Sequence, residues 1–389
     1  MKLLEELLTF EENIQAAKKE YSETRRATDE IAVKQLSKKG YLSEIEKEEI
    51  NIYHKKADSL DFSVKLLRYG HWFIRYVADG IAWHAYSSNR TKIRALGSKE
   101  AVSFLSGKEG LASETEMLNK IKGLGTDWLP ILHDLTNCLR IGDISIFWKS
   151  QLIDIIDVKA NGVISVWSSE EKLGGRIKRQ KQKLDRLWKF FETDNLSDIY
   201  PELWGRALHA KTIEKHNFEA ISIVMRKARR NGYGFVEPES GILYLAWHLD
   251  KCDENIALRK AMQKIPHIFQ STITFRTIQP RYDDYHSSLP ITAMELPAID
   301  ILDLSFGRIA VLTILNFDLF EKRCGYYGLP LHVIKNDKEF KFLVSKPFSG
   351  EVQEGLWNRL MLEGLSIESF CSLVKSIFKE IELQPISTP

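Results

Sequence analysis

The sequence predicts an α/β protein of three regions, and three observations support this fold class. A chain of 389 residues is too long for one ordinary hydrophobic core. Residues 1–95 have the spacing of charged and apolar residues that favours helices. Residues 96–200 place three strand-like runs between two helical stretches, which is typical of a compact α/β unit with a mixed sheet. Residues 201–389 alternate helix and strand signals, so we expect a C-terminal mixed α/β region for recognition, oligomerisation or regulation.

The N-terminal region is predicted to form two long helices. Residues 3–40 contain no proline, and Gly40 is the predicted stop of the first helix. Acidic and basic residues are mixed along it, which favours a solvated helical arm or hairpin over a nucleic-acid-binding tail. Residues 43–86 form a second helical stretch that becomes more apolar toward its end, so we expect that end to pack against the middle region of the chain.

The middle region begins with a loop and a short helix within residues 97–125. Its strand-like runs are LPILHDLTN, GDISIFW and LIDIIDVKA, and a basic helix, GGRIKRQKQKLDRLWKFFE, comes after them. In the C-terminal region we expect a helix over residues 212–232 with Gly232 as its C-cap. Strands at 234–238 and 241–249, a long loop near 278–290 and a terminal helix at 366–383 complete the prediction.

Composition limits the function classes. The 55 basic and 53 acidic residues nearly cancel, so any attraction to nucleic acid must come from a local patch. The cysteines form no CxxC or Cys/His pair, which disfavours a disulfide framework or a zinc site and favours reduced thiols in a cytoplasm. The first residues contain glutamates where a signal peptide needs an apolar run, and no window resembles a membrane span. We therefore expect a soluble, cytoplasmic protein.

Two aspartates and a lysine lie where two predicted strands meet. Because strand side chains alternate between faces, Asp157 and Lys159 share one face at the end of a run that is apolar on nearly both sides. Asp143 opens the preceding run, directly after Gly142, so all three can converge if these strands are neighbours. A buried carboxylate needs a partner. One candidate is Lys159, in a structural ion pair. The other is Mg²⁺ or Mn²⁺ held by Asp143, Asp157 and the carbonyl of Val158.

A third acidic ligand could come from the helix before the strands. Ser113 and Glu116 match a capping box, which explains Glu116 without catalysis. Glu114 precedes apolar residues by three, four and seven positions, so it points along the apolar face of the helix, toward the sheet. The alternative is an exposed first-turn glutamate that the helix dipole stabilises.

The helix after the strands combines an apolar stripe with an unusually basic face. Gln180 falls within the stripe of Ile177, Leu184, Leu187, Trp188 and Phe191. Asp185 is the one acid among the charged positions of this stretch, and we expect Arg176, Lys178, Arg179, Lys183 and Arg186 to contact phosphates. A solvated helix face is the alternative.

Together these residues resemble the PD-(D/E)XK nuclease superfamily over residues 110–192. The matching positions are Glu114, Asp143, the triplet Asp157-Val158-Lys159, and Gln180. "GD" replaces the nominal "PD", and aspartate replaces the commoner glutamate before x-K. The resemblance implies a nuclease core in which Asp143, Asp157 and Glu114 bind Mg²⁺ or Mn²⁺, Lys159 orients or deprotonates a water, and Gln180 positions water or phosphate.

The sequence thus predicts a Mg²⁺-dependent DNA endonuclease, with RNA left open as a substrate. The resemblance also implies a role in prokaryotic restriction or anti-phage defence and allows a homo-oligomer. The alternative is a non-catalytic nucleic-acid-binding or regulatory protein on a degenerate nuclease fold. His133 and Asp134 are expected on opposite faces of the first strand-like run. We expect His133 to be a hydrogen-bonded core histidine, and the alternative is that one of the two residues reaches the site.

Overall fold

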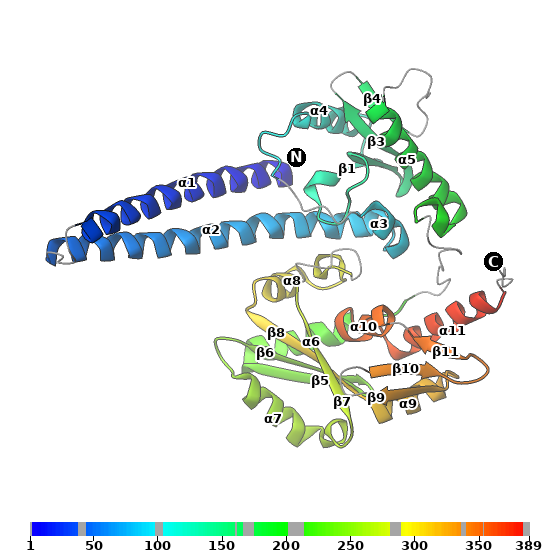
Figure 1. The fold of residues 1–389 in the computed structure, drawn as a ribbon. Coiled ribbons are helices and arrows are strands. Elements are labelled where there is room, and N and C mark those ends of the chain that lie inside the picture. The colour runs from blue at the N-terminus through cyan, green and yellow to red at the C-terminus, as the bar shows by residue number, and fades with distance from the viewer. Residues whose placement is uncertain are drawn as a thin grey trace. The chain divides into compact units, whose positions relative to one another are not determined.

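The structure is a computed structural model, and its chain gathers into two compact units (Figure 1). The first unit comprises residues 1–86 and 96–185, and the second comprises 87–95 and 186–389. The predicted N-terminal helical region thus shares a unit with the central sheet. None of the described helices combines the length and the apolar character needed to cross a membrane. The residues that the structure describes are 2–37, 44–97, 104–159, 162–165, 175–200, 214–280, 289–335, 340–352 and 354–383.

The first unit starts with an antiparallel helical hairpin of α1 (Lys2–Ser37) and α2 (Glu44–Ala85) (Figure 1). The short α3 (Arg90–Leu96) comes next in the chain and belongs mostly to the second unit. Both long helices were predicted from their spacing, while the expected stop at Gly40 lies outside the described residues. Leu7 and Ile14 of α1 are fully buried, as is Ala82 of α2. Each such buried leucine or isoleucine contributes about 1.5–3 kcal/mol to folding, which holds the pair together without a disulfide.

A four-stranded sheet comes after the hairpin in the first unit. Helix α4 (Leu111–Lys122) precedes β1 (Trp128–Leu132), β2 (Ile144–Trp148), β3 (Gln151–Lys159) and β4 (Gly162–Ile164). The strand order is β1-β2-β3-β4, and each neighbouring pair is antiparallel. The three predicted strands are confirmed, but the prediction of a mixed sheet was wrong. Short links join successive strands, and a parallel pair would need a crossover of a dozen residues or more.

The core of the first unit joins the hairpin, α4 and the sheet. Buried side chains from each pack together: Leu4, Leu7, Ile74, Leu105, Leu118, Ile121, Leu132, Ile144, Ile156 and Val158. The apolar end of α2 therefore does pack against the middle region, as its composition predicted. Helix α5 (Gly175–Thr193), the predicted basic helix, begins in this unit and continues into the second.

The second unit holds a second antiparallel sheet, of order β5-β6-β8-β7. Its strands are β5 (Tyr233–Glu239), β6 (Ile242–His248), β7 (Ile273–Ile278) and β8 (Ile309–Asn316). Helix α6 (Phe218–Asn231) ends at Gly232, whose φ of 86° confirms the predicted left-handed C-cap. Fully buried Leu243, Leu245 and Ala257 pack in the core of this sheet with α7 (Glu254–Lys264).

The rest of the second unit carries a smaller sheet and four helices. The strands β9 (Leu331–Lys335), β10 (Phe340–Val344) and β11 (Gly350–Val352) pair antiparallel in the order β11-β10-β9. The helices are α8 (Ala298–Ser305), α9 (Phe317–Tyr326), α10 (Glu354–Leu362) and α11 (Ile367–Leu383), and α11 is the predicted terminal helix. Most of the predicted loop at 278–290 lies outside the described residues.

Candidate functional site

Asp143 lies immediately before β2 and is held against β3. Its backbone N–H donates to the carbonyl of Ile156 at 2.8 Å, and its Oδ2 accepts the N–H of Val158 at 2.7 Å. Gly142 makes this close approach possible, because it has a φ of 78° and a Cβ there would lie 2.7 Å from Cγ2 of Ile155. Only glycine adopts this backbone region without cost. The "GD" pair therefore places the Asp143 carboxylate over the end of β3.

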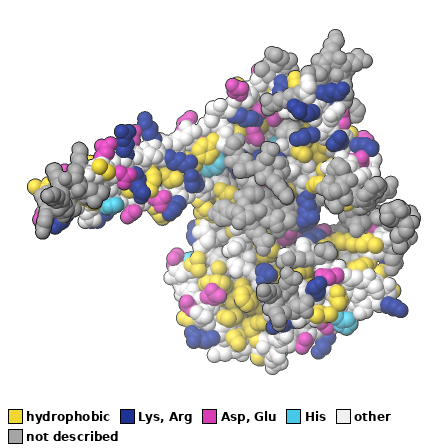
Figure 2. Space-filling model, viewed as in Figure 1, with side chains coloured by type: hydrophobic (Ala, Val, Ile, Leu, Met, Phe, Trp, Pro, Cys, Tyr) yellow, Lys and Arg dark blue, Asp and Glu magenta, His cyan; other side chains and the backbone are white. Residues whose placement is uncertain are grey.

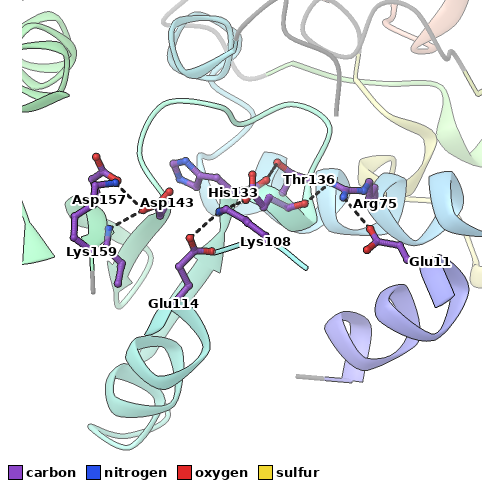
Figure 3. Close-up of polar contacts among 11 residues, drawn as sticks. Glu11, Arg75, Lys108, Glu114, His133, Thr136, Asp143, Asp157 and Lys159 are labelled. Carbon is purple, nitrogen blue, oxygen red and sulfur yellow. Dashed lines mark hydrogen bonds and ion pairs between the residues drawn. The ribbon is translucent and has the colours of Figure 1, made fainter. Parts of the chain in front are cut away.

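Asp157 and Lys159 lie beside Asp143 on β3 (Figure 3). The Lys159 ammonium forms an ion pair with Oδ1 of Asp157 and lies 4.0 Å from Oδ2 of Asp143. The Asp157 side chain is only 6% exposed, whereas that of Asp143 is 19% exposed. The structure thus brings together the two aspartates and the lysine that strand alternation placed on one sheet end.

The proximity of two carboxylates changes the protonation of the pair. Burial, a hydrogen bond with Asp157 and the negative charges of Asp157 and Glu114 raise the pKa of Asp143 to about 8, while the Val158 N–H opposes this rise. Without a cation, the pair therefore holds a proton at neutral pH. A divalent cation could replace that proton, since it would neutralise both carboxylates at once.

Glu114 is buried, but the helix that carries it begins differently from the prediction. The N-cap of α4 is Gly110, with a φ of 97°, and no side chain caps the helix. The predicted capping box of Ser113 and Glu116 was therefore wrong, because a left-handed glycine starts the helix earlier and Ser113 lies within it. Glu116 instead pairs with Lys120 at 2.7 Å. Glu114 is 2% exposed, so the alternative of an exposed first-turn glutamate was also wrong.

The Glu114 carboxylate is held by a lysine that sequence reasoning missed. Its Oε1 accepts from Nζ of Lys108 at 2.7 Å, and the same ammonium contacts the carboxylate of Asp134. Oε2 of Glu114 is buried and has no hydrogen-bond partner among the described residues. Burial raises the pKa of Glu114, an effect that Lys108 opposes.

The carboxylate oxygens of this site are ligands that suit a hard cation, but in the described part of the chain they do not form a complete metal-binding site. Among the described residues, no three acidic, histidine or cysteine side chains lie close enough to hold a metal ion. Asp143 and Asp157 nevertheless face each other as oxygen donors, while Glu114, whose Oε2 has no partner among the described residues, stands outside that pair. Oxygen donors of this kind fit Mg²⁺ or Mn²⁺ rather than zinc.

His133 and Asp134 lie in a 3₁₀ turn, η1 (His133–Leu135), because β1 ends at Leu132. The prediction that both sit on a strand was wrong. His133 is 1% exposed, and its Nε2 shares a 2.6 Å hydrogen bond with the Ser145 hydroxyl, which also contacts the Tyr86 hydroxyl at 2.6 Å. Burial lowers the pKa of His133 to about 4, so the ring is neutral. The prediction of a hydrogen-bonded core histidine is confirmed.

A buried polar network connects the turn at Asp134 to the helical hairpin (Figure 3). Arg75 of α2 donates to the Asp134 carbonyl and lies 3.6 Å from Glu11 of α1. Glu11 also contacts His71 at 2.9 Å and accepts the backbone N–H of Ser106 at 2.6 Å. Arg75 and Glu11 are almost fully buried, and burial lowers the pKa of Arg75 to about 10. Sequence reasoning missed this network, although charged residues at core-facing helix positions were the available signal.

Helix α5 presents most of the predicted basic residues to solvent, and Lys and Arg side chains gather over it in Figure 2. Lys181 differs, because it is buried and pairs with Asp185. Gln180 is half-buried, and its Oε1 has no hydrogen-bond partner among the described residues. The side chain of Arg176 lies outside the described part. Of the predicted phosphate contacts, the exposed ones are Lys178, Arg179, Lys183 and Arg186, and Lys189 of the same helix is exposed as well.

Comparison with family models, curated proteins and solved structures finds no match for this chain. A function is therefore best sought in the geometry around Asp143, Asp157 and Lys159. Its features are the buried Asp157 carboxylate in contact with the half-buried Asp143 carboxylate, an ammonium beside both, and a basic helix in the next segment of the chain.

Proposed function

We propose that the chain is a divalent-cation-dependent nuclease that hydrolyses phosphodiester bonds of DNA. The observation that carries the proposal is the pair of half-buried Asp143 and buried Asp157, with Lys159 alongside, at the end of two neighbouring antiparallel strands. The segment order supports it, since a helix, a run of strands and a basic helix also motivated the resemblance to PD-(D/E)XK nucleases; here four strands, β1 to β4, lie between α4 and α5. RNA is the second polymer to test.

Each residue has a specific task in the proposed reaction. Asp143 and Asp157, with the Val158 carbonyl and Glu114, would hold Mg²⁺ or Mn²⁺. When bound, such an ion polarises the scissile phosphate and lowers the pKa of a water. Lys159 orients that water and neutralises charge that develops on the phosphate oxygens.

Three further tasks are the release of a proton from the aspartate pair, the positioning of water or phosphate, and the binding of the polymer. Asp143 and Asp157 would release their shared proton to solvent if they held a cation, because the ion would compensate both negative charges. Gln180, whose Oε1 has no hydrogen-bond partner in the part of the chain that the structure describes, positions water or phosphate. The exposed basic residues of α5 contact the phosphate backbone, which supplies affinity without a choice of sequence. Water adds to phosphorus as the bond to the leaving oxygen breaks.

A second candidate is a non-catalytic nucleic-acid-binding or regulatory protein. The ion pairs favour it: Lys159 contacts Asp157, and Lys108 contacts both Glu114 and Asp134. Buried carboxylates with ammonium partners are also what a structural ion-pair network requires.

Cleavage of plasmid and linear DNA in Mg²⁺ or Mn²⁺ separates the two candidates. We expect wild type to cleave and Lys159→Ala and Asp143→Ala to lose activity by about 100-fold or more. Lys149→Ala is a matched control, because Lys149 is 59% exposed on the turn between β2 and β3. If both Lys159→Ala and Asp143→Ala still cleave DNA, the assignment of this site is wrong. Unchanged DNA retention without cleavage by any variant, wild type included, would favour the second candidate.

A further inference from the structure

We infer that Lys108 is a built-in counter-ion of the proposed cation site, and that its ammonium must leave Glu114 when a divalent ion binds there. The inference deepens the proposed function and rests on it for the identity of the ion. Lys108 lies outside the motif that suggested a nuclease, and it acts here as a positioning residue for Glu114.

The contacts place Lys108 where a cation would bind Glu114. Nζ of Lys108 is 2.7 Å from Oε1 of Glu114 and also contacts the Asp134 carboxylate, so one ammonium bridges two acidic groups. The second Glu114 oxygen is buried and has no partner among the described residues, although the side chain is only 3% exposed. The ammonium lies on the same carboxylate as this second oxygen, so its positive charge opposes a divalent ion that approaches Glu114.

Glu114 is also close to the main carboxylate pair. Its charge acts on Asp143, and the charge of Lys159 acts on Glu114. Figure 3 shows Glu114 with Lys108 on one side and Asp143 on the other. When all groups are ionised, the cluster of four carboxylates and two ammonium groups has two negative charges in excess, the charge that one divalent ion compensates. Its members are Glu114, Asp134, Asp143, Asp157, Lys108 and Lys159.

The local backbone lets the Lys108 ammonium move while the loop stays in place. Lys108 lies between Gly107 and Gly110, which have φ values of 80° and 97°, and a Cβ at Gly107 would meet nothing within 4 Å. The Lys108 side chain is 28% exposed, so its flexible stem can turn toward solvent. The preceding Ser106 N–H is anchored on Glu11 at 2.6 Å. A change of side-chain rotamer is therefore enough to free Glu114.

The test is Mn²⁺ binding to the full chain without nucleic acid, measured by titration calorimetry and by the paramagnetic resonance of free Mn²⁺. Lys108→Met removes the competing charge, so we expect about tenfold tighter binding. Lys108→Arg keeps the charge and should stay within about twofold of wild type. Lys120→Met is the matched control, because Lys120 pairs with Glu116 on the same helix at 2.7 Å but is 64% exposed.

The outcomes separate this inference from the proposed function. Equal Mn²⁺ affinity of Lys108→Met and Lys120→Met, or weaker binding by Lys108→Met, would overturn the counter-ion role even where wild type binds the ion. Mn²⁺ binding by Lys108→Met alone would support it. No binding by any variant would overturn both proposals, while binding without DNA cleavage counts against the proposed function only. Thermal melting in chelator checks folding, and Lys108→Gln replaces Lys108→Met where that variant does not fold.

Discussion

Replacing Asp143 by asparagine should remove a pH dependence of stability that the carboxylate pair creates. The pKa of Asp143 is raised to about 8 by burial and by Asp157. The native chain therefore binds a proton that the unfolded chain, with an aspartate pKa of about 3.9, has already released. The stabilisation from this proton is complete at pH values below the aspartate pKa of the unfolded chain. It is lost as the pH rises through the pKa that Asp143 has in the folded chain. One extra native proton corresponds to a slope of about −1.4 kcal/mol per pH unit.

Urea unfolding in chelator, at several pH values from about 5 to about 8, measures this effect. Tryptophan fluorescence follows the unfolding, and two of the nine tryptophans, Trp128 and Trp148, lie with their rings 6.4 Å apart across β1 and β2 of the sheet that carries the site. Between the lower and the higher pH, the free energy of unfolding of wild type should fall by about 2–4 kcal/mol more than that of Asp143→Asn. The range allows for the 19% exposure of the Asp143 side chain. Asparagine cannot ionise, yet it can keep the contact with the Val158 N–H.

Parallel curves for wild type and Asp143→Asn would refute the reasoning, since they would mean that the pair binds no extra proton. Glu116→Gln is the control for a carboxylate outside the site. Glu116 is exposed, and its hydrogen bond with Lys120 lowers its pKa, so it titrates below this pH window. Glu116→Gln should therefore show the same slope of the free energy of unfolding against pH as wild type.

Three further predictions concern the surroundings of the site. Gly142→Ala should destabilise the chain by about 2 kcal/mol, because its φ is positive and the new Cβ would meet Ile155; an unchanged urea midpoint would contradict this. Tyr86→Phe should cost about 1 kcal/mol by removing one hydrogen bond to the buried Ser145 hydroxyl, and a stability equal to wild type would argue against that bond. Lys183→Ala should weaken DNA retention equally for all sequences and lower the salt slope by about one, whereas an unchanged slope would remove Lys183 from the phosphate contacts.

Local patterns in the chain predicted the type and position of most elements that build the site. The helical period identified both long N-terminal helices, α4 and α5, and the alternation of side chains identified β2 and β3. The same patterns predicted which face of its helix or strand each candidate site residue lies on. Glu114 was predicted on the apolar face of its helix, and Asp157 and Lys159 on one face of their strand, because both periods are properties of neighbouring residues.

Tertiary packing decided which partners these side chains meet. Lys108 and Asp134 lie 26 residues apart in sequence, and Glu11 and Arg75 come from different helices, so no local period could connect them. The left-handed Gly110 moved the start of α4 and removed the expected capping box, and short connections made the sheet antiparallel. Periodicity shows which way a residue faces. Charged residues far apart in sequence become neighbours only when the hairpin, α4 and the sheet pack into one core. In that core each buried charge needs a partner.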